Sequence, residues 1–173
     1  MSTASEDLCR QALRDACGEV EGPIERHSLR VFLLAEQLAG DRPFDRELLA
    51  CASWLHDIGL YPPHSTREAY VVDGRRVAEE LLAGWEPERL RQCADAVELH
   101  HEPRSQADKG LEVELLRLAD RIEVSQGLLR AGLPRAVVRR IRREIPVKGF
   151  VPAVVRGLAK QRPASLPRIF FPR

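Results

Sequence analysis

The stretch Trp54-Leu55-His56-Asp57-Ile58-Gly59-Leu60 places an imidazole and a carboxylate side by side at the end of an apolar run. Apolar residues recur at helical spacing before it, Asp45 can cap that helix, and Tyr61-Pro62-Pro63 breaks the chain after it. His56 and Asp57 are therefore expected in the last turn before a loop, where both can bind one metal ion. A His-Asp dipeptide alone is weak evidence, because it is also typical of an ordinary helix end.

Helical periodicity extends along most of the chain, whereas strict alternation of apolar and polar residues is scarce. We therefore expect an all-α fold, a multi-helix bundle with a basic helical tail. Ser5, Asp45 and Thr66 are the expected first residues or caps of three helices, and glycine or proline marks most other ends. The expected helices cover approximately residues 5–16, 23–39, 45–56, 66–83, 87–101, 111–126, 133–144 and 151–161.

Composition narrows the class of protein. With 173 residues, 31% charged and 44% hydrophobic, the chain suits one folded globular domain. No apolar run approaches the ~20 residues that span a bilayer, and the N-terminus lacks the basic and apolar regions of an export signal. Four scattered cysteines form no CxxC pair, which favours reduced core residues in the cytoplasm. They are Cys9, Cys17, Cys51 and Cys93.

The charges are unevenly divided between two predicted regions. Residues 1–129, the expected helical domain, carry 15 basic and 25 acidic groups, while residues 130–173 carry 12 basic groups and one acidic group, Glu144. We expect this basic extension to pack on the acidic domain or on a partner, or to bind a polyanion.

Within that extension, four clustered arginines could contact phosphates. No aromatic residues interleave with them, so base stacking on a nucleic acid is poorly supported and a solvated basic face is favoured. Three phenylalanines instead suggest packing on the body or on a second copy of the chain, which leaves a homo-oligomer open. The arginines are Arg139, Arg140, Arg142 and Arg143, and the phenylalanines are Phe150, Phe170 and Phe171.

His27 and Asp120 complete the candidate metal set. His27 lies on the apolar seam of residues 23–39, and Asp120 lies where the seam of residues 111–126 would carry a core residue. Two imidazoles and two carboxylates suit one divalent transition ion: manganese, iron, cobalt, nickel or zinc. Such an ion lowers the pKa of bound water and polarises a phosphoryl oxygen. Alternatively, His27 is a hydrogen-bonded core residue, and Asp120 pairs with Arg121 or with an arginine of the tail.

Four segments resemble the HD-domain superfamily of metal-dependent phosphohydrolases. They are Arg26-His27-Ser28-Leu29-Arg30-Val31, Leu55-His56-Asp57-Ile58-Gly59, Glu98-Leu99-His100-His101-Glu102 and Leu118-Ala119-Asp120-Arg121-Ile122-Glu123. The resemblance is confined to these motifs but spans about residues 24–127. It implies an all-helical fold in which one metal ion is bound by His27, His56, Asp57 and Asp120, and it does not name a substrate.

Departures from the family pattern limit the branches of the superfamily that the chain can resemble. Members that cleave cyclic dinucleotides continue with a Gly-Tyr-Pro segment that is absent from residues 104–107, and nucleotidase-type members carry an acid where this chain has Leu60. The segments Tyr70-Val71-Val72-Asp73-Gly74 and Ala96-Val97-Glu98-Leu99-His100 look more like the cyanamide-hydratase-like branch. In that branch, water adds to a small substrate without phosphoryl transfer.

The pair His100-His101 has several interpretations. We favour one metal ion, with Asp57 and His100 as catalytic residues and His100 facing the pocket as a hydrogen-bond donor or proton shuttle. His101 is then a substrate-binding, supporting or surface residue. If the chain is similar to two-metal members, both histidines would bind a second ion, and His64 is the only candidate for the additional histidine of those enzymes.

Two further residues are candidates for substrate binding. Arg30 follows His27 by three residues and could reach a substrate phosphate, although a salt bridge to Glu98 or Glu123 is equally compatible with the sequence. Asp73 either lines the pocket or is a solvated helix residue.

The first hypothesis for function is a cytoplasmic, metal-dependent phosphohydrolase in which an activated water attacks a nucleotide or another small phosphorylated molecule. The second is a hydratase or hydrolase of a small nitrile- or amide-like compound. The third is a non-catalytic, metal-bearing module whose basic tail binds nucleic acid, which the missing aromatic residues make the weakest. No membrane partner is expected.

Overall fold

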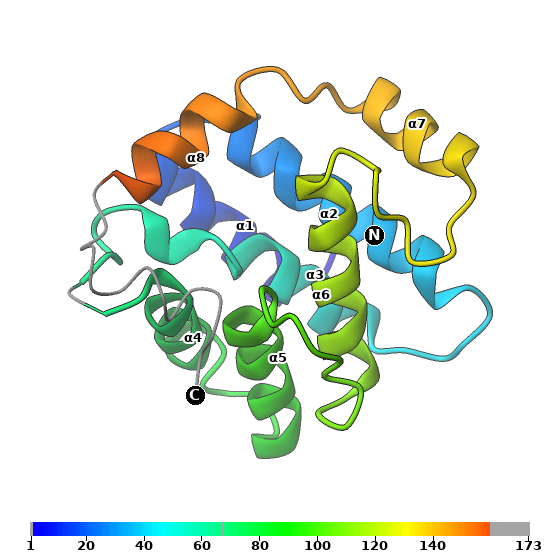
Figure 1. Cartoon of the computed structure of the whole chain (residues 1–173). Helices are drawn as coiled ribbons and strands as arrows, with labels where there is room; N and C mark the ends of the chain where they lie inside the picture. Colours follow the sequence, from blue (N-terminus) through cyan, green and yellow to red (C-terminus); the bar gives the residue numbers. More distant parts are fainter. Residues whose placement is uncertain (1, 67, 160–173) are drawn as a thin grey trace.

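The computed structural model describes residues 2–66 and 68–159, which form eight α-helices and one short 3-10 helix without any strand (Figure 1). The all-α prediction is confirmed. The helices are α1 (Ala4–Cys17), α2 (Pro23–Ala39), α3 (Arg46–Leu55), η1 (Ile58–Leu60), α4 (Tyr70–Leu81), α5 (Pro87–Leu99), α6 (Leu111–Val124), α7 (Arg135–Glu144) and α8 (Phe150–Leu158).

Helix α3 is the centre of the bundle, because every residue from Leu48 to Leu55 is buried. It packs against α1, α2, α5 and α6, while α4 covers α5, and α2 also packs along α6 (Figure 1). A helix that is apolar on all sides must be surrounded in this way. Consequently the end of α3, where His56 and Asp57 lie, is enclosed by other helices.

Local capping explains most of the helix boundaries. Asp45 accepts a hydrogen bond from the backbone N–H of Leu48 and starts α3, as the sequence predicts. The expected cap at Ser5 is wrong: Thr3 Oγ1 accepts from Glu6 N at 3.2 Å and starts α1 one residue before Ser5. The ends of α1 and α2 at Gly18 and Gly40 agree with the prediction.

The expected start of the fourth helix at Thr66 is also wrong, because α4 begins at Tyr70. The backbone N–H and the hydroxyl of Thr66 both donate to the carboxylate of Asp73, at 2.8 and 2.7 Å. These bonds hold the preceding loop against the first turn of α4 instead of extending the helix. Val124, the last residue of α6, is 53% exposed.

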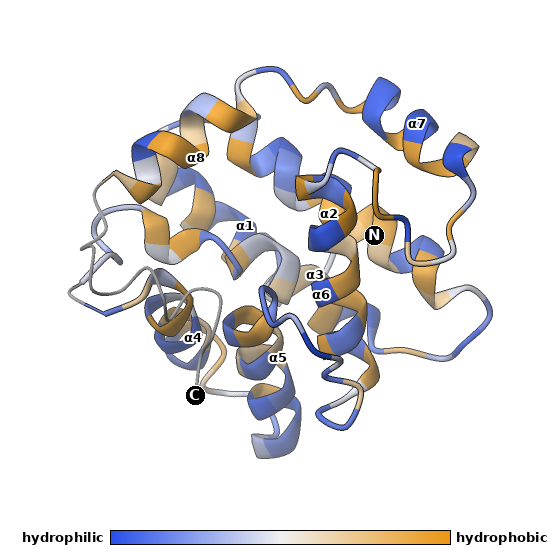
Figure 2. Ribbon diagram, viewed as in Figure 1, coloured by the Kyte–Doolittle hydropathy of each residue, from blue (hydrophilic) through white to orange (hydrophobic). Residues whose placement is uncertain are grey.

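The described part of the basic extension packs on the body. Helices α7 and α8 both contact α2. Val138 and Ile141 of α7 are buried, and Figure 2 shows hydrophilic residues along the outer side of this helix. Arg26 of α2 donates to the carbonyl oxygens of Pro146 and Lys148, which fixes the connection between the two helices. The acidic body and basic extension are therefore joined along α2.

Two predictions fall outside the described residues, namely the end of the last helix at residue 161 and the packing by Phe170 and Phe171. Among the residues that the structure describes, no helix is long and apolar enough to cross a membrane.

Candidate metal centre

The candidate ligands come from different helices and meet in the interior. His27 projects from α2, His56 and Asp57 follow the last residue of α3, and Asp120 lies on α6. Each of the four is at most 5% exposed. The structure therefore brings together all four residues for which the sequence predicts metal binding.

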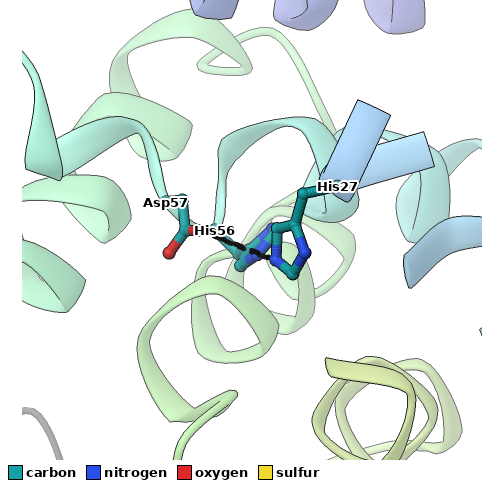
Figure 3. Close-up of side chains that lie close together, drawn as sticks. All are labelled: His27, His56 and Asp57. Carbon is teal, nitrogen blue, oxygen red and sulfur yellow. Dashed lines mark hydrogen bonds and ion pairs between the residues drawn. The ribbon is translucent and has the colours of Figure 1, made fainter. Parts of the chain in front are cut away.

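His27, His56 and Asp57 form the tightest part of the centre, and their side chains converge in Figure 3. The Nε2 atoms of the two histidines lie 3.1 Å apart. Asp57 Oδ2 is 3.6 Å from His27 Nε2 and 3.4 Å from His56 Nε2. Two nitrogen donors and one oxygen donor thus surround a single point, as the ligands of one ion must.

Asp120 and His101 extend this cluster. Asp120 Oδ1 lies 3.3 Å from His27 Nε2 and 3.9 Å from His56 Nε2, while Asp120 Oδ2 lies 3.4 Å from His101 Nδ1. Asp120 therefore has one oxygen toward the first three ligands and the other toward the histidine pair. His100, His101 and Asp120 form a second group whose donor atoms are close enough to hold an ion.

Hydrogen bonds to main-chain carbonyls fix two of the imidazoles. His56 Nδ1 donates to Ser53 O at 2.8 Å, and His100 Nδ1 donates to Val97 O at 2.6 Å. Since a carbonyl only accepts, the hydrogen lies on Nδ1 of each ring, and Nε2 of the neutral ring presents a lone pair to the cluster. Metal-binding histidines are usually oriented by this kind of bond. The donor set therefore fits a divalent transition ion.

The charges of the cluster are also compatible with a bound cation. Burial alone would lower the pKa of His27, but the carboxylates of Asp120 and Glu123 outweigh it and raise that pKa to about 9. Burial alone would raise the pKa of Asp57 and of Asp120, yet the neighbouring imidazoles hold the first well below its usual range and the second at about 2. Ionised carboxylates at this depth need a positive partner, which a divalent ion would supply.

Arg30 lies behind the cluster instead of facing a substrate. It is fully buried, and its guanidinium binds Glu123 Oε1 at 2.7 Å through both Nε and Nη2. This geometry favours the salt-bridge alternative over phosphate binding. Glu123 Oε1 also lies 3.9 Å from His27 Nδ1, so the pair supports the outer edge of that imidazole.

Asp73 is likewise placed away from the cluster, in its bonds to Thr66. It is 3% exposed and is therefore not a solvated helix residue. It is also not among the residues that line the cavity described below. Its role in this structure is to fix the loop that precedes α4.

Tyr70 is also part of the centre, although no site role is predicted for it from the sequence. Its hydroxyl lies 3.3 Å from His100 Nε2 and 2.5 Å from His101 Nε2. Burial, together with Asp57 and Asp120, raises the pKa of Tyr70 well above its usual value, so the hydroxyl keeps its hydrogen. His101 Nδ1 lies 3.4 Å from Asp120 Oδ2; with the ring hydrogen on Nδ1, Nε2 of that ring can accept from Tyr70. No periodicity or spacing in the sequence marks this residue.

His100 and His101 lie where the cluster meets a cavity of 460 Å³. Burial, then His101 and His56, lower the pKa of His100 to about 3, so this imidazole is neutral near pH 7. The cavity also reaches Asp120 and the exposed side chain of Arg121. Arg121 is a candidate anion-binding residue that the sequence identified only as an alternative partner of Asp120.

One family model, described as HD domain, matches residues 24–125 and thus more than half of the chain. The matched range contains every residue of the cluster. Among curated proteins, none matches the sequence. The likeness to the cyanamide-hydratase-like branch therefore stays a prediction.

Proposed function

Because this chain belongs to the HD domain family, whose members are metal-dependent hydrolases, we propose that it hydrolyses a phosphoester of a nucleotide or of another small metabolite. The observation that carries the proposal is the convergence of two imidazoles and two carboxylates beside a cavity that also contains an exposed arginine. A divalent transition ion held by His27, His56, Asp57 and Asp120 would lower the pKa of water and polarise a phosphoryl oxygen.

Asp57 and His100 are the residues best placed to handle the attacking water. Asp57 directs Oδ2 toward His27 and His56, whereas its Oδ1 lies 4.0 Å from His100 Nε2. Oδ1 could accept a hydrogen bond from water and orient that water toward the substrate. The neutral His100 ring presents the lone pair of Nε2 to the same space and can accept a hydrogen bond from the water there.

The cavity suits a small phosphorylated ligand. Its volume of 460 Å³ lies within the usual range for small-molecule sites, which is roughly 300 to 1,000 Å³. A phosphate near Asp120 would lie within the same cavity as the guanidinium of Arg121, which can bind it through two parallel hydrogen bonds. Val124 and Leu129 line another part of the wall and would contact an apolar portion of the substrate.

A nitrile- or amide-like substrate is the second candidate. The apolar wall formed by Val124 and Leu129 favours an uncharged ligand, and Leu60, which replaces an acid of nucleotidase-type members, is buried against Gly157. A site of this kind would not require the positive charge of Arg121. The effect of Arg121→Gln on turnover therefore separates the two candidates.

The test is a screen of the purified, metal-loaded chain against nucleotides, sugar phosphates, artificial phosphoesters, nitriles and amides. Metal content is measured beside it by elemental analysis. We expect near-stoichiometric transition metal, phosphoester hydrolysis, and at least a tenfold loss of kcat/KM in Arg121→Gln. Turnover of nitriles or amides that is insensitive to Arg121→Gln would instead support the second candidate.

A matched pair of variants controls for contamination and for misfolding. Asp57→Asn removes one carboxylate of the cluster, whereas Asp95→Asn removes another buried carboxylate that binds Arg75 and Arg91 outside it. We expect only Asp57→Asn to lose the metal and the activity. Equal activity in Asp57→Asn and in the wild type would show that the measured hydrolysis does not come from this site.

The proposed location is the cytoplasm. Cys9, Cys17, Cys51 and Cys93 are all free thiols, which supports a reducing compartment.

A further inference from the structure

A second hollow lies on the other side of the loop that follows α6. Its volume is 1030 Å³, and its walls are formed by that loop, by α7 and by Val147. Ser125 and Leu129 of the loop line the cavity of the metal centre, whereas Gln126, Gly127 and Leu128 line this hollow. The two spaces share no lining residue, so the second is separate from the metal centre.

Positive charge converges on this hollow. Six arginines line it, and no acidic residue is among its described lining residues. Only Arg142 has an ion-pair partner, which is Glu123 at 2.7 Å. The other five arginines make no ion pair or side-chain hydrogen bond in the described part of the chain. They are Arg130, Arg135, Arg139, Arg140 and Arg143.

Several arginines elsewhere on the surface behave differently. Arg75, Arg76, Arg89 and Arg91 each bind one or more carboxylates of the body. In α7, by contrast, Arg135, Arg139 and Arg143 follow one another at intervals of four residues, so like charges face each other along the helix. Such pairs are unfavourable without an anion between them.

The walls of the hollow are held in place. Gly127 has φ +79 and approaches Val138 so closely that an added Cβ would lie 2.9 Å from Val138 Cγ1. Arg142 donates both to Glu123 Oε2 and to Glu123 O at the end of α6. These contacts fix α7 against the loop, so the guanidinium groups surround a concave space of defined shape and are not spread over a flat face.

We propose that this basic hollow, formed by Gln126–Arg130 and α7, is a binding site for a compact ligand that carries several phosphate groups. Guanidinium groups bind phosphate oxygens in pairs of parallel hydrogen bonds, and several of them around one space match a ligand with several phosphates. No aromatic side chain on which a nucleic-acid base could stack is among the described residues that line the hollow. A compact polyphosphate is therefore favoured over a single-stranded nucleic acid.

The test is calorimetric titration of the metal-loaded full chain with inorganic tripolyphosphate, with metal content measured afterwards. One triple variant, Arg135→Gln with Arg139→Gln and Arg143→Gln, removes three charges from the hollow. The control triple variant, Arg104→Gln with Lys109→Gln and Arg156→Gln, removes three exposed charges that lie outside it. We expect at least a tenfold weaker affinity in the first and less than a twofold change in the second.

Three outcomes would overturn the proposal. The wild type does not bind tripolyphosphate, or both triple variants weaken binding equally, or tripolyphosphate fails to displace a bound single-stranded oligonucleotide of mixed sequence. The last result would assign the hollow to a polymer. Phosphoester turnover is measured in parallel, and we expect it to be unchanged in the first triple variant. Binding is measured independently of turnover, so the site can be established even if the proposed hydrolysis is not found.

Discussion

Tyr70 offers a sharp test at the scale of one residue, because its hydroxyl touches both His100 and His101 while its ring is buried. Tyr70→Phe keeps the ring and removes only the hydroxyl. We expect kcat for the proposed hydrolysis to fall roughly 10- to 100-fold, since residues that orient the groups of a metal site contribute about this much. Steady-state kinetics measures the fall.

Metal content distinguishes the interpretations of that result. Because the Tyr70 hydroxyl bonds to the histidine pair and is not itself one of the four proposed ligands, Tyr70→Phe should retain its ion. Unchanged kcat, or loss of the metal together with the activity, would contradict a positioning role through the histidine pair.

Glu123 should be more important for stability than an acidic residue at the surface. It is 1% exposed and binds the fully buried Arg30 as well as Arg142. Glu123→Gln leaves the Arg30 charge without its partner, so we expect the free energy of unfolding to fall by about 3–5 kcal/mol. Urea denaturation of both proteins provides the measurement.

Glu80→Gln is the matched control, because the Glu80 side chain is 60% exposed and pairs with Arg76. It should change the free energy of unfolding by less than about 1 kcal/mol. Similar losses of unfolding free energy in both variants would mean that the buried ion pair stabilises the fold no more than the exposed one.

The sequence could predict the residues of the cluster whose chemical type and position were unusual. His27 and Asp120 lie on apolar seams, and His56-Asp57 follows a mostly apolar helix, so each stands out in the sequence alone. Tyr70 and Arg121 are ordinary at their positions, and only their tertiary neighbours reveal them. The role of Arg30 was ambiguous for the same reason, since the sequence does not show whether it pairs with Glu98, with Glu123 or with a substrate.

At the scale of the elements, Gly59 determines how closely η1 approaches α4. An added Cβ would lie 2.1 Å from Tyr70 O and 2.9 Å from Asp73 Cβ. Gly59→Ala must therefore displace the start of α4, and we expect a loss of about 3 kcal/mol or more in the free energy of unfolding. Metal affinity should also fall, because Asp57 lies just before η1.

Gly84→Ala provides the comparison, since no atom lies within 4 Å of the position that its Cβ would occupy. We expect its midpoint of urea denaturation to stay close to that of the wild type. If Gly59→Ala were equally harmless, the close approach of η1 and α4 would not be a constraint.

Glu25 links α1 to α2 and should make the stability depend on pH. Burial alone would raise its pKa, but hydrogen bonds from Arg14 and Arg10 outweigh it and lower the pKa. A lowered folded pKa means that the contribution is present above the unfolded pKa, about 4.3, and is lost as pH falls through the folded value. The free-energy difference between wild type and Glu25→Gln should thus be constant near neutrality and shrink below about pH 4.

Urea denaturation at a series of pH values tests this expectation. The exposed Glu19 serves as the control, and the difference between wild type and Glu19→Gln should stay small throughout. If the free-energy difference between wild type and Glu25→Gln increased as the pH was lowered, this would contradict the role assigned to the two arginines.

Helix boundaries show where local sequence rules suffice and where they fail. Gly18, Gly40 and Asp45 act within one turn of their own helix, so their roles could be predicted. Thr66 satisfies the same rule, but its hydroxyl and N–H bind Asp73, and α4 starts four residues later. A competing contact of this kind cannot be predicted from the sequence pattern of helix caps.

For the whole molecule, metal removal should lower thermal stability. The proposed ion would connect residues of α2, of the end of α3 and of α6, and it would bind only the folded chain. At about 100 times the dissociation constant, binding adds about 2.7 kcal/mol, which corresponds to a rise in Tm of roughly 5–10 °C for a chain of this length. Differential scanning calorimetry of metal-loaded and dialysed protein measures the change.

His56→Ala is the control for that experiment. Without one of the four ligands, added metal should leave the Tm unchanged, whereas a wild-type response in this variant would place the ion elsewhere. The His56 ring is fully buried, so the variant itself is expected to unfold at a lower temperature than the wild type.

The ligand order along the chain has a consequence for biosynthesis. His27, His56 and Asp57 leave the ribosome well before Asp120, which lies on α6 and closes the other side of the centre. A nascent chain that ends before residue 120 has three donors and no fourth, and α3 still lacks the helix that covers it. Stable metal binding should therefore occur only after α6 has been synthesised and has docked against α2.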